Sequence, residues 1–549
     1  MEPTPTQRDI IKEDGNTVVL ASPGSGKTYV MSEKIKLLLG GDKMCDYQGV
    51  IAISYTRKAS NHLKQKVLSS GIWEKNSFFG TIDSFCLTQI ILPFGNFVFG
   101  YPLTEVLPIT EDEIKEERKV DFAWIKEDHP DYDSIEESAW LNLYALYQEG
   151  KVLINSLELL ALHIIKKSAA CRLHLRARFK YVFIDEFQDA DTYTNSIFNE
   201  FIGLGLIGNV VGDVNQSIFG FAHKKSEYLE ALETTPGFKS FRLSENLRSS
   251  IPIVNYSNRL LDEKSKIIET EKEGVELISV VGDEIKVSEY LNNYIGEDCK
   301  KWDVIDMSQV AVLVKNLRTQ TYIDNNLGIP HRVVFSTPLD DDVNPRSRLY
   351  GQLLQFYFDN SMPFMSVIDD YADYDMFTSL TRKKLMKLKK EIKAVKEDEI
   401  AVKFPKLYKE IADILLSKYQ EGNALLHLTR VLGSEKMIDS YRPLKNNEVV
   451  IMTLHKAKGL EFDIVYHLNM NEWELPYQKV HNGDFDHPDF PTWNQDIDLH
   501  YVGVTRARKL CVLITSSQRH NTNDELKKSK PSIFLYQNGV DKLRNNYSY

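Results

Sequence analysis

The sequence predicts an α/β fold built on parallel sheets. Eight short runs of apolar and β-branched residues recur between stretches with helical periodicity. Continuous apolar strands of this length are typical of a parallel sheet that helices cover on both faces. A chain of 549 residues is also long enough for about three to four domains. The predicted strands are Thr17–Leu20, Val50–Ile53, Tyr181–Ile184, Asn209–Val211, Val310–Val314, Val449–Met452, Asp463–Tyr466 and Leu510–Ile514.

Composition and charge exclude several classes of protein. With 42% hydrophobic and 26% charged residues, the chain has a globular composition, unlike a disordered or collagenous protein. A formal net charge of −11 argues against binding nucleic acid through bulk charge, although it allows a local basic groove. The five cysteines include no CxxC pair, so neither a zinc site nor a disulfide framework is indicated. Because the chain lacks a signal-peptide pattern and any apolar run of about 18 residues, we expect a soluble cytoplasmic protein.

Two stretches with helical character differ in charge from the rest of the chain, and we interpret them as insertions. Residues 104–138 carry 13 Asp and Glu against 4 Lys and Arg, and a surface of that sign repels phosphates. Thr381–Lys396 has eight bases opposed only by Glu391. This run is interpreted either as a solvated helix face or as a contact with a duplex backbone. The same two interpretations, a solvated helix or a DNA-binding face, stay open for Lys166–Lys180, which has six bases and no acid.

A phosphate-binding loop follows the first predicted strand, and Tyr29–Leu39 is predicted to continue it as a helix. Glycines and small residues let backbone N–H groups curl around phosphates, and the helix N-terminus adds partial positive charge. In such a loop Lys27 reaches the β- and γ-phosphates and the Thr28 hydroxyl ligates Mg²⁺. The predicted nucleotide-binding residues here are Ser22, Pro23, Gly24, Ser25, Gly26, Lys27, Thr28 and Tyr29.

Two adjacent carboxylates, Asp185 and Glu186, follow the buried strand Tyr181–Ile184. The carboxyl ends of parallel strands meet at one edge of a sheet, so this pair is expected to face the phosphate loop. Two such carboxylates are expected to have different roles, with Asp185 binding Mg²⁺ and Glu186 polarising the attacking water. The sequence therefore predicts hydrolysis of a nucleoside triphosphate.

Further motifs follow in a fixed order along the chain, from Gln7 to Ala507. They are Ile53–Ala59, Gly80–Cys86, Asp185–Asp189, Val211–Phe221, Glu245–Ser249, Met452–Phe462 and Tyr501–Ala507. Together they resemble the motifs of superfamily 1 DNA helicases of the UvrD/Rep/PcrA type. The compact build also resembles the UvrD-like helicase subunit of Gabija-type anti-phage defence systems, which works beside a nuclease.

This resemblance implies two RecA-like P-loop motor domains in tandem, each interrupted by a mainly helical insertion, with ATP bound in the cleft between them. The first motor domain is expected at residues 1–98 and 150–248, its acidic helical insertion at 99–149, the second motor domain at 249–345 and 446–549, and its helical, Lys-rich insertion at 346–445.

The resemblance also implies roles for single residues. Gln7 would read the adenine edge, and Gln216 would sense the γ-phosphate and couple it to DNA. Arg248 and Arg506 would clamp the γ-phosphate from the second motor domain, while Glu461 would approach the ribose. Guanidinium groups that arrive across a cleft stabilise the charge of the transferring phosphoryl group, so hydrolysis would be tied to domain closure.

A motor that moves on any sequence is expected to bind the strand by base stacking and phosphate contacts. The resemblance gives six candidates: Tyr55, Phe219 and Phe221 for stacking, and Arg57, Thr81 and His455 for phosphates. Two residues depart from the pattern of the family. Leu247 stands where relatives usually have a tyrosine that stacks on adenine, and Asp83 replaces a usual histidine in a strand-contacting motif.

The resemblance thus implies an ATP-dependent DNA helicase or translocase that hydrolyses Mg-ATP and moves 3′→5′ on single-stranded DNA. Its expected partners are single-stranded or tailed DNA and, in a defence complex, a nuclease. The alternative is a regulatory ATPase subunit that senses DNA ends or nucleotide and gates a partner nuclease with little unwinding of its own. An RNA-directed motor is a third interpretation, since no residue shows whether a 2′-hydroxyl is read.

Overall fold

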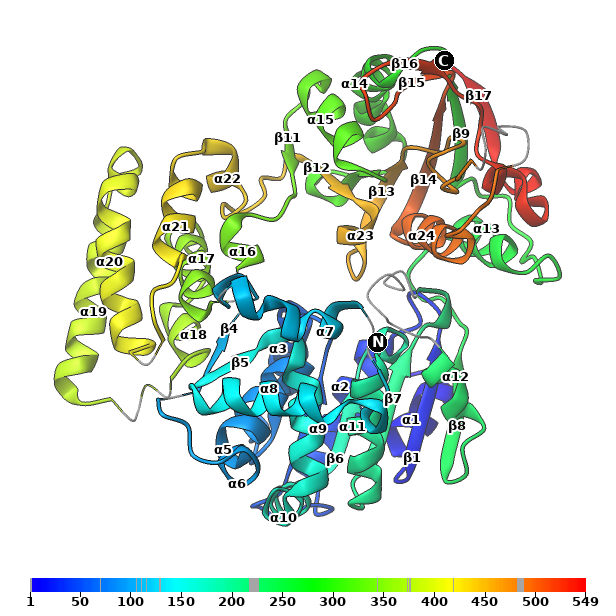
Figure 1. Cartoon of the computed structure of the whole chain (residues 1–549). Helices are drawn as coiled ribbons and strands as arrows, with labels where there is room; N and C mark the ends of the chain where they lie inside the picture. Colours follow the sequence, from blue (N-terminus) through cyan, green and yellow to red (C-terminus); the bar gives the residue numbers. More distant parts are fainter. Residues whose placement is uncertain are drawn as a thin grey trace.

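Two parallel sheets organise the chain (Figure 1). The computed structural model describes residues 2–549 except for 70, 105, 110, 115, 128–129, 217–226, 343, 373, 375–376, 418 and 481–487. All eight predicted strand segments are strands of these two sheets, which confirms the α/β prediction. Among the residues described, none of the helices has the length together with the apolar character needed to span a bilayer.

The first sheet is parallel throughout and has the strand order β3-β2-β6-β7-β1-β8. Apolar clusters cover both of its faces. Because the strands are parallel, the segments that follow β1, β2, β6 and β7 all emerge at the same edge. Its strands are β1 (Asn16–Ala21), β2 (Gly49–Ile53), β3 (Phe78–Gly80), β6 (Phe179–Ile184), β7 (Ile207–Gly212) and β8 (Phe238–Leu243).

The second sheet is also parallel, with the order β11-β12-β10-β13-β14-β9-β17. Two further apolar clusters cover its faces. The strands are β9 (Val275–Val280), β10 (Val310–Val314), β11 (His331–Val333), β12 (Val449–Thr453), β13 (Phe462–His467), β14 (Ala507–Ser516) and β17 (Asn545–Ser548). The hairpin β15 (Gln518–His520) and β16 (Leu526–Lys528) forms a small sheet of its own.

The α-helices of the first half pack around the first sheet and its insertion (Figure 1). They are α1 (Pro5–Lys12), α2 (Lys27–Gly40), α3 (Arg57–Leu68), α4 (Ile82–Phe85), α5 (Leu92–Phe94), α6 (Asn96–Phe99), α7 (Trp124–Glu127), α8 (Glu137–Gln148), α9 (Leu157–Lys167), α10 (Ala169–Arg178), α11 (Thr192–Gly203) and α12 (Glu227–Glu233). The predicted helix after the phosphate loop is therefore present as α2.

The α-helices of the second half divide between the second sheet and a separate helical unit. Those near the sheet are α13 (Ile251–Leu261), α14 (Glu284–Lys301), α15 (Leu317–Asn326), α23 (Leu454–Ala457) and α24 (Trp493–Thr505). Between β11 and β12 the chain forms α16 (Pro338–Asp341), α17 (Pro345–Phe358), α18 (Phe364–Asp369), α19 (Ser379–Ala394), α20 (Ile400–Leu415), α21 (Ala424–Leu432) and α22 (Glu435–Asp439), which share a hydrophobic core.

The acidic stretch 104–138 contains several short helices and one strand. Its described α-helical residues are those of α7 and the first residues of α8, and 3-10 helices occupy Glu111–Glu113, Glu116–Phe122 and Tyr132–Ser134. A strand, β4 (Leu107–Ile109), pairs in parallel with β5 (Lys151–Leu153). Pro108 and Pro130 limit how far a helix can continue, so the helices of this stretch are short.

The basic run 166–180 lies at the end of the first sheet where the parallel strands begin, because α10 leads directly into the first residue of β6. Two of its cations bond the protein's own backbone: Arg172 donates to Ile165 O at 2.7 Å and Arg178 to Asn76 O at 3.2 Å. This run is therefore at the opposite end of the sheet from the motifs, and its contacts favour the structural interpretation.

Candidate active site

The phosphate loop connects β1 to α2 and is shaped by two glycines. Gly24 and Gly26 have φ of +70° and +87°, a region that favours glycine because it has no Cβ. Ser25 Oγ donates to Ser22 O at 2.7 Å and closes the turn. A Cβ on Gly24 would lie 2.4 Å from Asn246 Oδ1 and 2.7 Å from Arg248 Cβ. The loop therefore touches the segment that leads into the second half of the chain.

Gln7 lies behind this loop and is buried. Its Nε2 donates to Ser25 O at 2.9 Å, and its Oε1 accepts from Thr4 N at 3.0 Å. Both ends of the amide are engaged, so in this structure Gln7 braces the loop. Leu247 lies beside the loop as well, since its N donates to Gly24 O at 3.0 Å and its side chain is 40% exposed.

Lys27 and Glu186 face each other across the edge of the first sheet, with Nζ 3.8 Å from Oε2. Glu186 has a left-handed backbone, φ +53°, which is strained for a residue with a side chain and is typical of functional sites. Burial disfavours its charge, but Lys27, Lys458 and Arg506 outweigh that effect and lower the pKa of Glu186 to about 2. Glu186 is therefore ionised, as a residue that polarises water must be.

Asp185 differs from its neighbour in charge state. Burial, followed by repulsion from Glu186, raises the pKa of Asp185 to about 7. A divalent cation would remove that penalty, and the Asp185 carboxylate and the Thr28 hydroxyl are the hard oxygen donors that Mg²⁺ prefers. These residues fit a magnesium ion. When bound, Mg²⁺ would neutralise charge on the β- and γ-phosphates.

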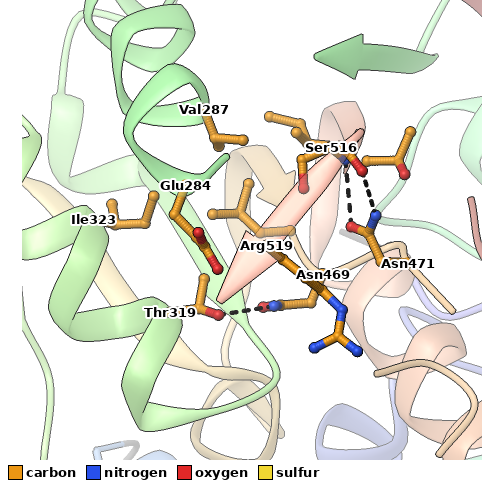
Figure 2. A pocket seen from close by; sticks show the side chains of 11 residues that line it. Glu284, Val287, Thr319, Ile323, Asn469, Asn471, Ser516 and Arg519 are labelled. Carbon is orange, nitrogen blue, oxygen red and sulfur yellow. Dashed lines mark hydrogen bonds between the residues drawn. The ribbon is translucent and has the colours of Figure 1, made fainter. Parts of the chain in front are cut away.

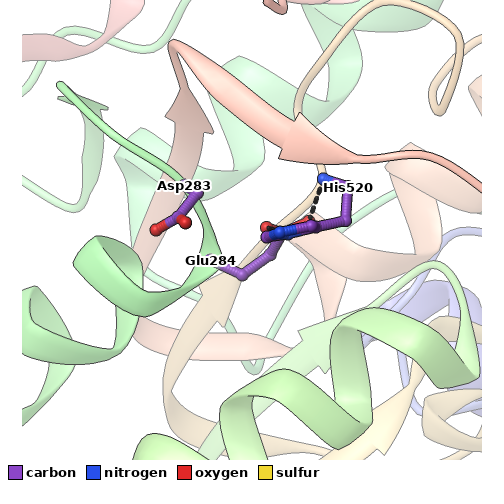
Figure 3. A group of neighbouring side chains, drawn as sticks. All are labelled: Asp283, Glu284 and His520. Atoms are coloured by element: carbon purple, nitrogen blue, oxygen red, sulfur yellow. Dashed lines mark hydrogen bonds and ion pairs between the residues drawn. The ribbon is translucent and has the colours of Figure 1, made fainter. Parts of the chain in front are cut away.

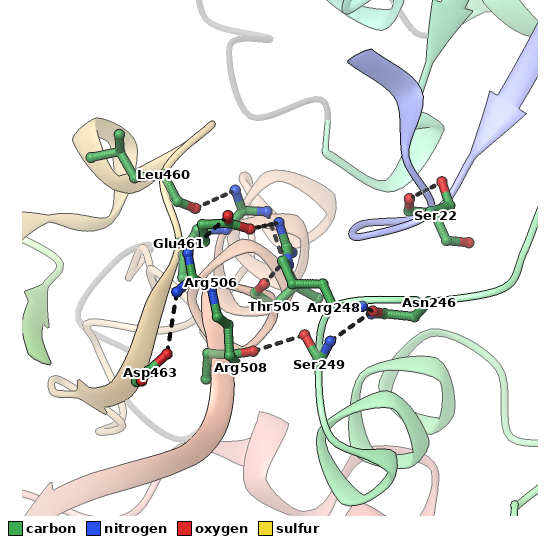
Figure 4. A network of polar contacts seen from close by, with 12 residues as sticks. Ser22, Asn246, Arg248, Ser249, Leu460, Glu461, Asp463, Thr505, Arg506 and Arg508 are labelled. Atoms are coloured by element: carbon green, nitrogen blue, oxygen red, sulfur yellow. Dashed lines mark hydrogen bonds and ion pairs between the residues drawn. The ribbon is translucent and has the colours of Figure 1, made fainter. Parts of the chain in front are cut away.

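Two arginines meet near the phosphate loop, Arg248 from the segment between β8 and α13 and Arg506 from the junction of α24 and β14 (Figure 4). Arg506 is 2% exposed and donates to Gln216 Oε1 at 3.2 Å and to Leu460 O at 3.1 Å. Arg248 donates to Glu461 Oε2 at 3.2 Å and to Thr505 O at 2.6 Å. Burial, with repulsion from Arg248, lowers the pKa of Arg506 to about 9. Two cations held this close together in a buried place favour an anion between the halves of the molecule.

The Arg248 side chain also has an unsatisfied hydrogen-bond donor among the described residues. Its Nε is buried and has no hydrogen-bond partner among the described residues. An unsatisfied buried donor on a cation costs free energy that a bound anion would recover. The site therefore fits a polyphosphate ligand on grounds independent of the sequence motif.

Gln216 connects the two halves of the chain. Its Nε2 donates to Asp213 Oδ2 at 2.7 Å, its Oε1 accepts from Arg506, and its backbone O accepts from Lys458 Nζ at 2.6 Å. Lys458 also pairs with Asp189 Oδ2 at 2.6 Å. Lys458 lies within the motif Met452–Phe462, and the sequence alone indicates no role for it. Its signal in the sequence was its position between His455 and Glu461, in the connection that joins β12 to β13.

The predicted DNA contacts are only partly visible. Tyr55 follows β2 and is 42% exposed. Thr81 caps α4, since its hydroxyl accepts from Ser84 N at 3.3 Å. His455 is in α23, where burial and then Lys315 lower its pKa, and Asp83 is exposed at the start of α4. Phe219, Phe221 and the side chain of Arg57 lie outside the described residues.

Two polar clusters away from the cleft bond mainly within themselves. A cavity of about 20 Å³ lies beside the carboxyl ends of β13 and β14 (Figure 2). In it Asn469 Nδ2 donates to Thr319 Oγ1 at 2.9 Å, and Asn471 to Ser516 O at 2.7 Å. Nearby, Glu284 accepts from the backbone N of His520 and lies 2.8 Å from its Nδ1, beside Asp283 (Figure 3). We assign both clusters a structural role.

Two parallel sheets, a phosphate loop at the edge of one and an arginine supplied from beside the other define a tandem RecA-like P-loop ATPase. The chain belongs to the UvrD-like DNA helicases, a family of enzymes that hydrolyse ATP and act on DNA. The model of the UvrD/REP helicase N-terminal domain matches residues 4–98 and 103–236 of the chain. The model of the UvrD-like helicase C-terminal domain matches residues 353–518.

Several curated relatives are similar over most of their length. Gabija protein GajB of Bacillus cereus (strain VD045) is 25% identical, and the match covers 94% of this chain and 96% of the relative. DNA helicase II of Haemophilus influenzae is 23% identical, with 95% and 84% covered. ATP-dependent DNA helicase PcrA of Staphylococcus epidermidis is 22% identical, with 96% and 85% covered.

Proposed function

We propose that this protein is an ATP-driven motor that moves 3′→5′ on single-stranded DNA. The observation that carries the proposal is the meeting of Lys27 and Glu186 from one half of the chain with Arg506 from the other. Glu186 and Arg506 are close enough for each to influence the other's pKa. The ion pair of Lys458 with Asp189 adds a second link across the same cleft.

In the proposed reaction Glu186 polarises the attacking water, and Lys27, Arg248 and Arg506 stabilise the charge of the γ-phosphoryl group. Gln216 senses the phosphate, because its amide joins Asp213 to Arg506. Binding ATP would draw the two halves together, and hydrolysis would release them. Alternating closure and opening would move the strand held across both sheets.

The remaining expectations about the site belong to the same proposal. The loop residues Ser22 to Tyr29 would hold the triphosphate, with Thr28 and Asp185 as ligands of Mg²⁺, and Glu461 would approach the ribose. The two motor domains would be residues 1–98 with 150–248 and residues 249–345 with 446–549. The expected location is the cytoplasm.

The test is an ATPase assay with and without a single-stranded oligonucleotide. Stimulation by DNA should collapse in Lys27→Ala and in Glu186→Gln. Lys36→Ala is the matched control, because Lys36 lies on the same helix but pairs with Glu33 on its surface at 2.8 Å. Hydrolysis that no oligonucleotide stimulates in the unaltered protein would refute the motor, and a strand displaced from a 5′-tailed but not a 3′-tailed duplex would refute the polarity.

A defence role is proposed from the length of the relatives. The match covers 96% of GajB but 84–85% of the helicases named above, so this chain is as compact as GajB. We propose that it acts in an anti-phage complex with a nuclease. Co-expression with the protein encoded by the adjacent gene, followed by gel filtration, tests this. Separate elution with no effect on either activity would count against the complex.

The compact build also motivates a second function, in which the chain is a regulatory ATPase that gates the nuclease and unwinds little. The two functions differ in one measurement. A motor should displace a strand from a tailed duplex in the absence of any partner. A regulatory subunit should hydrolyse ATP without displacement, while ATP changes the rate at which the partner cleaves DNA.

A further inference from the structure

The second sheet ends in β17, which has a neighbouring strand on one side only among the described residues. β17 pairs in parallel with β9. Tyr549 continues this pairing beyond the strand, because its N donates to Ser279 O at 3.0 Å and its O accepts from Val281 N at 2.8 Å. β17 lies at the outer edge of the second sheet, away from the first sheet (Figure 1). The free side of β17 is therefore separate from the cleft that contains the ATPase residues.

The backbone groups on the free side of β17 belong to two residues. Along a strand, the N–H and C=O of one residue point to one side, and those of the next residue point to the other. Tyr549 bonds to β9, so the alternate residues Asn545 and Tyr547 face β9 as well. Asn546 and Ser548 therefore point away from it. Both are exposed, and their four backbone groups make no hydrogen bond within the part of the chain that the structure describes.

The other three outer strands of the two sheets have features that discourage pairing with a further strand. β3 and β11 have three residues each, and β8 carries Lys239 and Arg242. Short length and charge are common protections of a sheet edge. β17 includes neither a charged residue nor a proline, and Tyr547 is 47% exposed. Among the outer strands, β17 is therefore the one on which further pairing is least opposed.

Aromatic contacts with α14 hold this edge in place. The ring of Tyr549 lies 5.2 Å from that of Tyr290 and 5.8 Å from that of Tyr294, measured between ring centres. Asn293 Nδ2 donates to Tyr549 OH at 2.9 Å. A strand that is already ordered loses little conformational freedom when it pairs, which favours association.

We propose that two copies of this chain associate through β17 and join their second sheets into one continuous sheet. A two-fold axis, the commonest symmetry of protein dimers, makes the paired strands antiparallel. With the axis at Tyr547, Asn546 of each copy lies opposite Ser548 of the other and exchanges both backbone hydrogen bonds with it. All four outward groups of each strand are then satisfied.

The side chains are compatible with this register. Tyr547 meets Tyr547 of the other copy as a pair without backbone hydrogen bonds, where the Cα atoms lie about 4.5 Å apart and side chains are closest. Aromatic pairs across strands stabilise a sheet, and like charges opposite each other destabilise it. Since every residue of β17 is uncharged, self-pairing brings no like charges together in the strand.

The uncharged sequence of β17 favours a second copy over a strand of another protein. Electrostatic complementarity selects and orients a foreign partner, and β17 has no charged residue for that purpose. Self-pairing has the opposite requirement, because a charge at the axis would meet itself. A strand of four residues buries a small area, and interfaces below about 1,200 Å² are weak. We therefore expect a reversible dimer that forms at micromolar concentrations.

The first experiment measures the mass of the full-length chain by sedimentation velocity between about 1 and 100 µM. Ser548→Pro is the test variant, because it removes an outward N–H and leaves the bonds to β9 in place. Ser548→Ala is the matched control, since it keeps that N–H. The unaltered chain and the control should dimerise as the concentration rises. Ser548→Pro should dimerise at least about tenfold more weakly, because the pair loses two of its four hydrogen bonds.

A second variant disrupts the pair without altering the backbone. Tyr547→Glu places two carboxylates opposite each other at the axis and should also prevent dimerisation. Tyr101→Glu is its control, an equal change of charge on a tyrosine of the first half that is 81% exposed. Circular dichroism and thermal melting verify that all four variants fold.

The second experiment tests the register by disulfide formation. Cys45 is exposed and the other four cysteines are buried, so Cys45→Ser is the background. In it, Tyr547→Cys should form an intermolecular disulfide with oxidised glutathione, because a Cα separation of about 4.5 Å suits the bond. Asn546→Cys is the control. Its counterpart in the other copy lies two residues along the pair, about 8 Å away, beyond the limit of about 7 Å for a disulfide.

Several outcomes would overturn this dimer. A chain that stays monomeric up to about 100 µM excludes the second copy. If the protein encoded by the adjacent gene then bound the chain and Ser548→Pro abolished that binding, the edge would belong to the other protein. Dimers of Ser548→Pro and Tyr547→Glu as strong as those of their controls would place the interface elsewhere. Cross-linking of Asn546→Cys as fast as that of Tyr547→Cys would refute the register. Each result is independent of the motor function, because no ATPase residue lies in β17.

Discussion

Replacing Arg506 by alanine removes the cation that links the two halves of the site. Among the residues that the structure describes, the guanidinium makes four hydrogen bonds, and the one to Gln216 Oε1 joins the two halves of the chain. An arginine that arrives across a cleft contributes about 10³–10⁵-fold to the turnover of phosphoryl transfer. Because Arg248 brings a second cation to the same network, we expect the lower end of that range. DNA-stimulated kcat should fall about 10³-fold while ATP still binds.

The same change has a structural cost that the experiment must separate from catalysis. Val502 O and Leu460 O would lose a buried donor, a cost of about 1–3 kcal/mol of folding free energy. Arg506→Lys is the informative second variant, because it keeps the charge and loses the planar fork. Its kcat should lie between those of Arg506→Ala and the unaltered protein.

Arg508→Ala is the matched control. Arg508 is two residues away and pairs with Glu461 and Asp463, with no bond to Gln216. We expect its kcat to change less than about tenfold. Steady-state ATPase at saturating oligonucleotide, with binding of a fluorescent ATP analogue, gives both quantities. A folded Arg506→Ala protein that keeps kcat within tenfold of the unaltered enzyme would show that the cleft geometry does not drive hydrolysis.

Three further predictions follow from the site. Lys458→Met removes the ion pair with Asp189 and should lower DNA stimulation at least about tenfold while nucleotide still binds; equal stimulation would contradict it. Gly24→Ala should abolish binding of a fluorescent ATP analogue. Gly237→Ala, at φ +89° with open space around it, should only lower the melting temperature. If both variants bound the analogue equally well, the role of Gly24 in nucleotide binding would be contradicted. In the absence of metal, the Asp185 carboxyl of the folded chain stays protonated up to about pH 7, whereas the unfolded chain loses this proton near the ordinary pKa of 3.8. The folded state therefore binds more protons between these two pH values, and its stability falls as the pH rises through that range. Asp185→Asn should flatten this slope in thermal melts with EDTA, and an unchanged slope would contradict the raised pKa.

Much of the fold could be predicted because its signals are local. A strand such as Val310–Val314 is apolar at every position, and that pattern is sufficient to indicate a strand buried on both faces. The phosphate loop could be predicted for the same reason, since its glycines and Lys27 are consecutive. Strand β4 in the stretch 104–138 was not predicted, because it depends on pairing with β5 across more than 40 residues.

In the site, too, contacts between residues far apart in the sequence could not be predicted. Nothing near Lys458 indicates that its amine would bond Asp189, 269 residues earlier. The amide of Gln7 provides a similar case, because only the folded loop shows that it donates to Ser25 O. The unsatisfied Nε of Arg248 is likewise a property of its surroundings.

The sequence by itself determined the class of the sheets, the phosphate loop, the paired carboxylates and the order of the motifs, because each depends on residues that are neighbours along the chain. The tertiary structure decided which charges meet. Arg506 lies beside Gln216, and the lysines of α19 point away from the core of their own helical unit. Packing of the apolar residues sets the path of the backbone, and the path of the backbone sets the positions of the charged side chains. Electrostatic attraction depends on distance in space, and only the folded chain sets that distance.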